Sequence, residues 1–443
     1  MVNTIKKHKN LYFIWALMVL CVSVSVVTSN VFVLAAVLLF GVAAFVLSVN
    51  DLIVLMVALL PFANVFKLSA DSTSLFTIAE IFTLIIAIWH VKKIKMSLFI
   101  SLLVFAVYAL AFSYQQMNFL VIVKLLIGFL LVYYACKLLN QKDMVNMAYT
   151  LSFGTGLTML LAENPGYFSQ LQKYFVEINH YVDASGHAAD IVRNGGFIGE
   201  PNCSAVAVML SLCFLCLLYY YKQIGTEFWV LTVFLGIIGF FTYSKSYFLS
   251  FAAFCIFLLL FVLFPKHRGW AVVAIIAICV FVALAFSGKI EIFNMIFDRF
   301  SDDGDITTGR AELNEQYLRY IFSHPKTLLF GDSIASDRYE GAANNVHNFY
   351  IELLYKLGIF GAALYVVTWL LACGNKQSAL RTKKRHFVHF MPLVFFLILY
   401  FFLAGTTRYE LPVYMILIYC ALNYVPEKTQ ENSELCAKEA TND

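Results

Sequence analysis

Arginine, glycine and asparagine gather in the segment RNGGFIGEPN, residues 193–202. Glycine lets a backbone approach a ligand closely, and Pro201 followed by Asn202 is typical of a helix start with a capping side chain. Such a helix start offers free N–H groups to a phosphate, and Arg193 would add bidentate donors. The pattern therefore indicates either an anion-binding turn or a plain tight turn with one exposed arginine.

Two further basic residues lie in polar segments that follow apolar runs. Lys245 stands between two serines in TYSKS, where it could contact a phosphate or snorkel to the membrane surface. Arg310 opens GRAE, and the segment Arg310–Ser323 is predicted to be helical and to break at Pro325. Lys245 is thus a candidate for binding an anion at a membrane surface.

The segment HNFYIELLYKLGIFG carries the remaining chemistry. His347 could act as a general base near neutral pH, although a lone histidine also fits a structural role. His347 or Asn348 is expected near the start of a membrane span. Glu352 and Lys356 are four residues apart, which predicts a helical ion pair near the membrane surface.

These residues are embedded in an unusually apolar chain. Of its 443 residues, 61% are hydrophobic and 13% charged, against about 45–50% apolar and about 25% charged in soluble domains. This composition excludes a soluble globular enzyme, a disordered tail protein and a nucleic-acid binder. The ten cysteines show no metal-binding spacing, and His180 and His187 lack a third ligand, so no metal site is predicted.

The apolar residues form about fourteen runs, two of which are short. Because a helix needs about 20 apolar residues to cross a bilayer, we predict an all-α integral membrane protein, a polytopic bundle of about 12–14 transmembrane helices. The first run is expected to be a retained span and not a cleaved signal.

Lysine and arginine in short loops predict which side of the membrane each loop occupies. Nearly all of this charge lies in five loops: VKKIK, Lys137–Asp143, the stretch around Lys222, PKHRG and NKQSALRTKKRH. This distribution places both termini in the cytoplasm and Lys245 and Arg408 outside. We therefore expect one membrane domain over 1–443. Its predicted parts are a first extracytoplasmic loop at 163–201, a large extracytoplasmic loop at 288–349 that forms a cap, and a cytoplasmic tail at 426–443.

Taken in order, the motifs RNGGFIGEPN, SKS, GR with HP and GDS, and HNFYIELLYKLGIFG resemble the O-antigen polymerase and O-antigen ligase superfamily. The resemblance covers about residues 190–370, and residues 1–160 match only as a row of spans. It implies a metal-independent, inverting membrane glycosyltransferase that needs no cofactor. The donor would be a glycan on undecaprenyl pyrophosphate at the outer face of the plasma (inner) membrane.

The resemblance also implies roles for particular residues. Arg193 and Arg310 would hold the pyrophosphate, and His347 would activate the acceptor hydroxyl. Lys245 stands where the superfamily usually has arginine, so it keeps the charge and loses the forked geometry. Further residues are predicted to bind or orient substrate: Glu200, Asn202, Asn348, Glu352 and Arg408. Lys124, inside an apolar run, is a functional candidate or a snorkelling side chain.

Three functions fit these observations. The first is a polymerase of surface-polysaccharide repeat units (O-antigen, capsule or exopolysaccharide), which would work beside a flippase and a chain-length regulator in a lipid membrane. The second is a ligase that moves finished glycan to lipid A core or another surface acceptor. The third is a transporter of lipid-linked glycan, which would require charges and broken helices near mid-membrane. A structural scaffold would not need an ordered series of basic motifs.

Overall fold

The structure is a computed structural model of the whole chain. The residues that it describes are 8–28, 31–68, 74–112, 119–163, 177–182, 188–193, 195–264, 310–336, 338–340, 342, 345–374, 386–403, 408 and 410–424, with isolated positions between 269 and 287. The predicted cytoplasmic tail, 426–443, and the first part of the predicted large loop, 288–309, lie outside the described residues.

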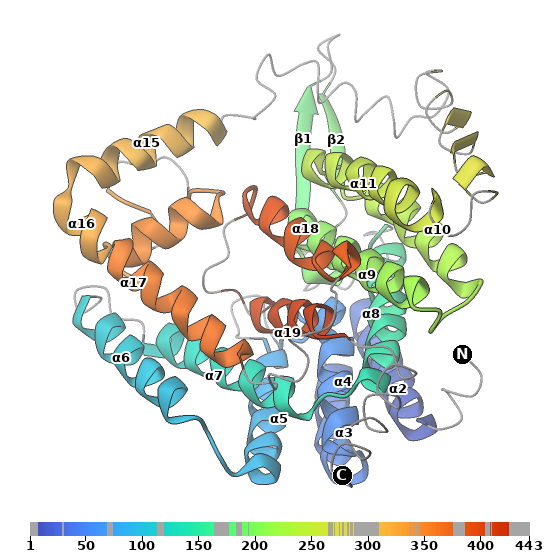
Figure 1. Cartoon of the computed structure of the whole chain (residues 1–443), viewed down its shortest axis with the longest axis horizontal. Helices are drawn as coiled ribbons and strands as arrows, with labels where there is room; N and C mark the ends of the chain where they lie inside the picture. Colours follow the sequence, from blue (N-terminus) through green and yellow to red (C-terminus); the bar gives the residue numbers. More distant parts are fainter. Residues whose placement is uncertain are drawn as a thin grey trace, which may run out of the picture.

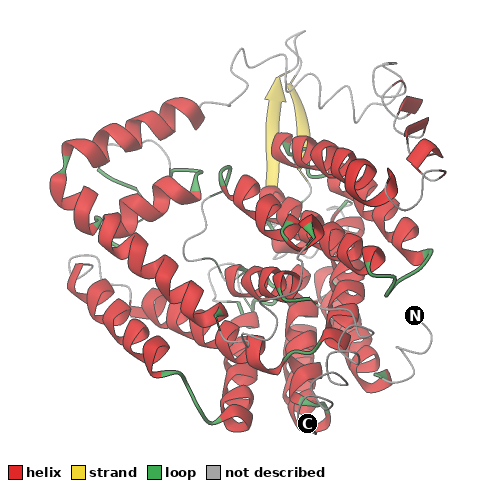
Figure 2. Ribbon diagram, in the orientation of Figure 1, coloured by secondary structure: helices red, strands yellow, loops and turns green. Residues whose placement is uncertain are grey.

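Helices make up most of the described chain (Figures 1 and 2). By length and composition, five of the described helices are able to cross a membrane. They are α2 (Lys9–Val27), α7 (Phe119–Leu138), α9 (Pro201–Tyr220), α11 with its π-helical continuation (Lys245–Leu263) and α17 (Phe349–Cys373).

Shorter apolar helices pack around these five. They are α3 (Val31–Val46), α4 with the turn η1 (Val49–Phe62), α5 (Phe76–Val91), α6 (Met96–Phe112), α10 (Glu227–Phe240), α18 (Met391–Tyr400) and α19 (Leu411–Leu422). The helix α8 (Gln141–Ala162) is as long as a span and more polar than the others. The predicted class, an all-α polytopic membrane protein, is confirmed.

The helix α9 lies at the centre of the bundle and is almost wholly buried. It packs against α8, α10, α11, α18 and α19, so its sequence has apolar or small residues on every side. The first residues of α9 belong to RNGGFIGEPN. Side chains at this helix start therefore meet residues from several other elements.

The segment before α9 contains a short β-hairpin that the sequence analysis did not predict. The strands β1 (Glu177–Val182) and β2 (Ala188–Arg193) are antiparallel, and Glu177 stands opposite Arg193 in the register. The single-turn helix η5 (Gly196–Ile198) follows. Arg193 is thus the last residue of a strand that leads directly into the glycine-rich turn.

Two helices lie in the part of the predicted cap between residues 310 and 330. The helix α15 (Arg310–Ser323) has the predicted bounds, and Pro325 begins a new helix, α16 (Pro325–Phe330). A Cβ added to Gly331 would lie 2.3 Å from the Lys356 carbonyl oxygen, so only glycine lets the end of α16 approach α17 this closely. The end of α16 also lies against Gly358, where α17 is kinked and φ is 61°.

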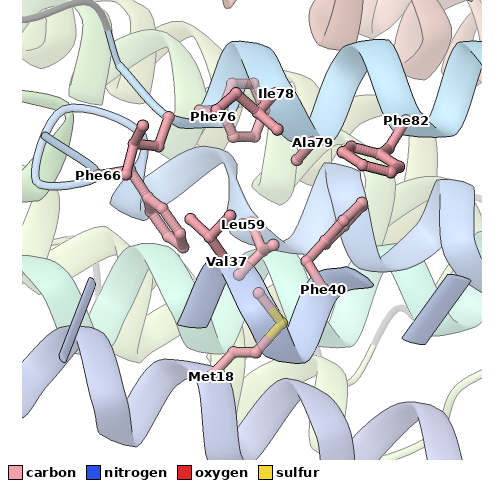
Figure 3. A pocket seen from close by; sticks show the side chains of 10 residues that line it. Met18, Val37, Phe40, Leu59, Phe66, Phe76, Ile78, Ala79 and Phe82 are labelled. Atoms are coloured by element: carbon pink, nitrogen blue, oxygen red, sulfur yellow. The ribbon is translucent and has the colours of Figure 1, made fainter. Parts of the chain in front are cut away.

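The N-terminal helices α2, α3, α4 and α5 enclose a small pocket (Figure 3). Its labelled side chains are all apolar: Met18 from α2, Phe40 from α3, Leu59 from α4 and Phe82 from α5, among others. Because the described residues that line it present no polar or charged side chain, we assign this pocket to helix packing.

Candidate functional site

The start of α9 differs from the prediction in one respect. Pro201 is the first helical residue, as expected, but the N-cap is Glu200, which makes no side-chain capping bond. The Asn202 Oδ1 atom instead accepts a hydrogen bond of 2.9 Å from Ser244 Oγ. The predicted capping role of Asn202 is therefore wrong, because its side chain is buried and faces the start of α11 instead of its own backbone.

The partner turn, SKS, begins α11. Ser244 is the N-cap, and its Oγ accepts from the backbone N–H of Tyr247. Ser244 and Ser246 are joined by a hydroxyl contact of 2.8 Å. Because the one hydroxyl hydrogen of Ser244 goes to Asn202, Ser246 is the donor in that contact. Lys245, the first residue of α11, is thereby positioned beside the start of α9.

Arg408 joins the start of α9 to the segment before α19. Its guanidinium donates to Glu200 Oε2 and to Cys203 Sγ. A second carboxylate, Glu410, lies 3.7 Å from the Nη1 atom of Arg408 and is 1% exposed. Burial alone would lower the pKa of Arg408, but Cys203 and the two nearby carboxylates raise it, so this cation stays charged.

The glycine-rich turn is tied to the same helix start. The carbonyl oxygen of Gly195 accepts from Ser204 Oγ in the first turn of α9 and from the backbone N–H of Gly199. A Cβ on Gly199, where φ is 94°, would lie 2.2 Å from Asn64 Nδ2. The turn that follows Arg193 is thus held by hydrogen bonds to the Gly195 carbonyl oxygen, and the positive φ of Gly199 favours glycine at that position.

The start of α17 forms a second polar group. Asn348 is the N-cap, and its Oδ1 accepts from the backbone N–H groups of Tyr350 and Ile351 at 3.1 and 3.3 Å. His347, directly before it, is exposed. The predicted position of this pair at a span start is confirmed, and Asn348 is engaged in capping.

The predicted ion pair between Glu352 and Lys356 is present and buried. The Lys356 Nζ atom lies 2.9 Å from Glu352 Oε1, and both side chains are less than a tenth exposed. A buried pair of this kind is costly to break from one side, because the other charge is left without its partner. The pair therefore fixes the first turns of α17, between the Asn348 cap and the Gly358 kink.

A third set of polar side chains lines one small pocket. It consists of Thr77 and Glu80 of α5, Lys124 of α7 and Arg408. Glu80 is buried, and its Oε1 atom has no hydrogen-bond partner among the described residues. The sequence analysis named Lys124 and missed Glu80, although an acid inside an apolar run is itself a signal of function. Burial and the nearby Lys124 charge lower the pKa of Lys67, in the loop before α5.

Direct contacts therefore join Glu200, Asn202 and Arg408 with the turn that holds Lys245. Arg193, Arg310 and His347 lie on three separate elements: the end of β2, the first residue of α15 and the residue before the cap of α17. In Figure 1 the hairpin and α15 lie in the upper half of the view, away from the lower ends of α3 and α5. The convergence of these three side chains on one pocket stays a prediction.

The fold and the polar helix starts define a polytopic membrane protein with cations and carboxylates concentrated near helix ends. A family model described as O-antigen ligase matches residues 230–366, from α10 into α17. This match confirms the resemblance to the O-antigen polymerase and ligase superfamily and supports a membrane enzyme of the glycosyltransferase type that acts on lipid-linked glycans. No curated protein and no solved structure matches the chain.

Proposed function

We propose that this protein polymerises lipid-linked repeat units of a surface polysaccharide. It transfers glycan from undecaprenyl pyrophosphate to the acceptor sugar of a second lipid-linked unit, at the outer face of the plasma membrane. The observation that carries this proposal is the O-antigen ligase match over 230–366, because that segment contains five of the nine candidate residues. These are Lys245, Arg310, His347, Asn348 and Glu352.

In this proposal the chain is one membrane domain with both termini in the cytoplasm. The segments 163–201 and 288–349 are then extracytoplasmic, and the starts of α5, α7, α9, α11, α17 and α19 lie on the same outer side. The contacts of Arg408 with Glu200 and of Asn202 with Ser244 support this topology, because each joins two elements that it places outside.

The reaction breaks the bond between the anomeric carbon and the pyrophosphate oxygen and forms a bond from that carbon to the acceptor oxygen. Negative charge develops on the leaving pyrophosphate, and positioned cations stabilise it best where water is excluded. Arg193, Arg310 and Lys245 supply these cations. Arg408 is engaged with Glu200, so we assign it to orienting the start of α9 and the glycine-rich turn.

The acceptor hydroxyl loses its proton to a general base. His347 is the candidate, since it is exposed and stands beside the rigid cap of α17. A positioned base of this kind accelerates transfer by about 10²–10⁴-fold. Attack from the side opposite the pyrophosphate inverts the anomeric centre, and the proposed mechanism needs neither a metal nor a nucleotide cofactor.

One observation favours a second function. The matching family model is described as an O-antigen ligase, and a ligase would use the same donor and the same cations. It would differ only in its acceptor, which would be lipid A core or another surface molecule in place of a second lipid-linked unit.

Deletion of the gene, followed by analysis of the lipid-linked intermediates, separates these functions. A polymerase deletion leaves single repeat units, whereas a ligase deletion leaves long chains on the carrier. Loss of a transporter leaves intermediates that reagents added outside the cell cannot reach. Complementation with Arg310→Ala should fail. Arg319→Ala is the matched control, because Arg319 lies on the same helix with a side chain 78% exposed, and it should restore the product.

A further inference from the structure

A second hydrophobic core, separate from the main core of the bundle, joins α15 to the first two turns of α17 (Figure 1). Its buried members are Tyr317, Ile321, Ala342, Val346 and Tyr355. The Tyr355 side chain is fully buried and meets the Tyr317 ring edge to face, with 5.3 Å between the ring centroids. Aromatic pairs in this geometry attract each other beyond their apolar burial. We call this set of side chains the cap core.

Two members of the cap core lie close in sequence to predicted catalytic residues. Val346 directly precedes His347, and its backbone hydrogen-bonds the Tyr317 side chain. Tyr317 follows Arg310 by seven residues, or about two turns of α15. The position of Tyr317 therefore sets the position of the helix that carries Arg310. The cap core thus joins the backbone that carries Arg310 to the backbone that carries His347.

The backbone of Tyr355 binds a further segment, the GDS turn at residues 331–333, directly after α16. The kink at Gly358 interrupts α17, so carbonyl groups just before it are available to donors from other segments. The Tyr355 carbonyl oxygen accepts a hydrogen bond of 2.9 Å from the backbone N–H of Asp332. The kink in α17 therefore supplies the acceptor that holds the GDS turn.

The Tyr355 side chain binds the same turn through its hydroxyl. Its oxygen donates to Asp332 Oδ2 at 3.0 Å and lies 2.8 Å from the hydroxyl oxygen of Ser336, which is buried. Because the one hydroxyl hydrogen of Tyr355 goes to the Asp332 carboxylate, Ser336 is the donor in its contact with Tyr355. The ring, the carbonyl group and the hydroxyl group of Tyr355 thus bind three different partners, all in the predicted cap.

We propose that Tyr355 is a positioning residue, which holds the backbones of Arg310 and His347 in one arrangement for glycosyl transfer. This inference rests on the proposed function for the roles of those two residues. Apolar contacts alone are not directional, whereas the hydrogen bonds of Tyr355 fix the turn after α16 at one place on α17. A displacement of about 1 Å can lower a reaction rate about 10²-fold. The competing role for Tyr355 is stability of the cap core alone.

Kinetics of Tyr355→Phe separate the two roles, because this variant keeps the ring in the cap core and removes only the hydroxyl. For the full chain in phospholipid nanodiscs, we expect kcat to fall about tenfold with KM for the lipid-linked glycan changed less than about twofold. Tyr339→Phe is the matched control and should keep the wild-type kcat. Its ring packs against the same core, and its hydroxyl makes no hydrogen bond within the described part of the chain.

Asp332 tests the same hydrogen bond from the other side. Asp332→Ala should lower kcat as much as Tyr355→Phe does. Asp332→Asn should restore most of the rate, because its side-chain carbonyl still accepts from the Tyr355 hydroxyl. The double variant Tyr355→Phe with Asp332→Ala should be no slower than either single variant, since all three lack the same bond. A role in stability alone predicts less folded protein with the wild-type kcat in the fraction that is folded.

Hydrogen–deuterium exchange of the same proteins measures the arrangement without the reaction. Tyr355→Phe and Asp332→Ala should raise the exchange of backbone amides in α15 and α16 and leave α9 unchanged. If the wild-type protein forms no glycosidic bond while exchange rises in this way, the proposed function fails and the hold of Tyr355 on the cap stands. If the wild-type protein transfers glycan and both variants keep the wild-type kcat, the positioning role is overturned and the proposed function stands. Unchanged exchange in α15 and α16 overturns the inference whatever the activity.

Discussion

The contact between Arg408 and Glu200 gives the sharpest energetic prediction. Arg408→Ala removes a charge-assisted hydrogen bond, and such bonds contribute about 1.5–3 kcal/mol. It also removes the cation 3.7 Å from Glu410, which is almost fully buried. Breaking a buried ion pair from one side costs about 3–5 kcal/mol. Because Arg408 and Glu200 are 30% and 24% exposed, we expect a loss of about 3 kcal/mol in the free energy of unfolding.

A double-mutant cycle measures the pair itself. Arg408→Ala and Glu200→Gln, alone and together, are compared by reversible detergent unfolding, with an expected coupling of about 1.5–3 kcal/mol. Arg319→Ala with Glu315→Gln is the matched control. That pair is 78% and 61% exposed, so its coupling should be no more than about 0.5 kcal/mol. A coupling between Arg408 and Glu200 as small as that of the control pair would refute the role of Arg408 in orienting the start of α9.

Three further predictions concern the reaction. Arg193→Ala or Arg310→Ala should abolish the long-chain product while the protein still inserts into the membrane. Normal chains on a gel would refute the hypothesis that these arginines hold the pyrophosphate. His347→Ala should accumulate lipid-linked single repeats, detectable by mass spectrometry, whereas a wild-type product ladder would exclude its role as base. EDTA should leave the activity of the purified enzyme intact, and a loss restored by Mg²⁺ would contradict metal-independent transfer.

Some of these features could be predicted from residues that are close together in the sequence. Arg310–Ser323 was predicted with its observed bounds because Pro325 cannot continue the helix but readily starts a new one. The ion pair of Glu352 and Lys356 follows from their four-residue spacing alone. Each depends on residues within one turn or two of the chain.

Contacts between distant segments could not be predicted in this way. Asn202 and Ser244 are 42 residues apart, and Arg408 and Glu200 are 208 apart. Capping rules consider only a side chain and the backbone near it, so they predicted that Asn202 caps α9. In the structure its side chain instead accepts a hydrogen bond from Ser244, at the start of α11. Glu80 is a different case, because its isolation in an apolar run was visible in the sequence.

Formation of a glycosidic bond by the purified protein tests the central claim most directly. The protein is incubated with one lipid-linked repeat unit, and released undecaprenyl pyrophosphate, product length and anomeric configuration are measured. We predict carrier-linked glycans of increasing length, one undecaprenyl pyrophosphate released per bond, and inversion at each newly bonded anomeric carbon. An unchanged substrate, or glycan moved across the bilayer without a new bond, would contradict the assignment of this protein as a glycosyltransferase.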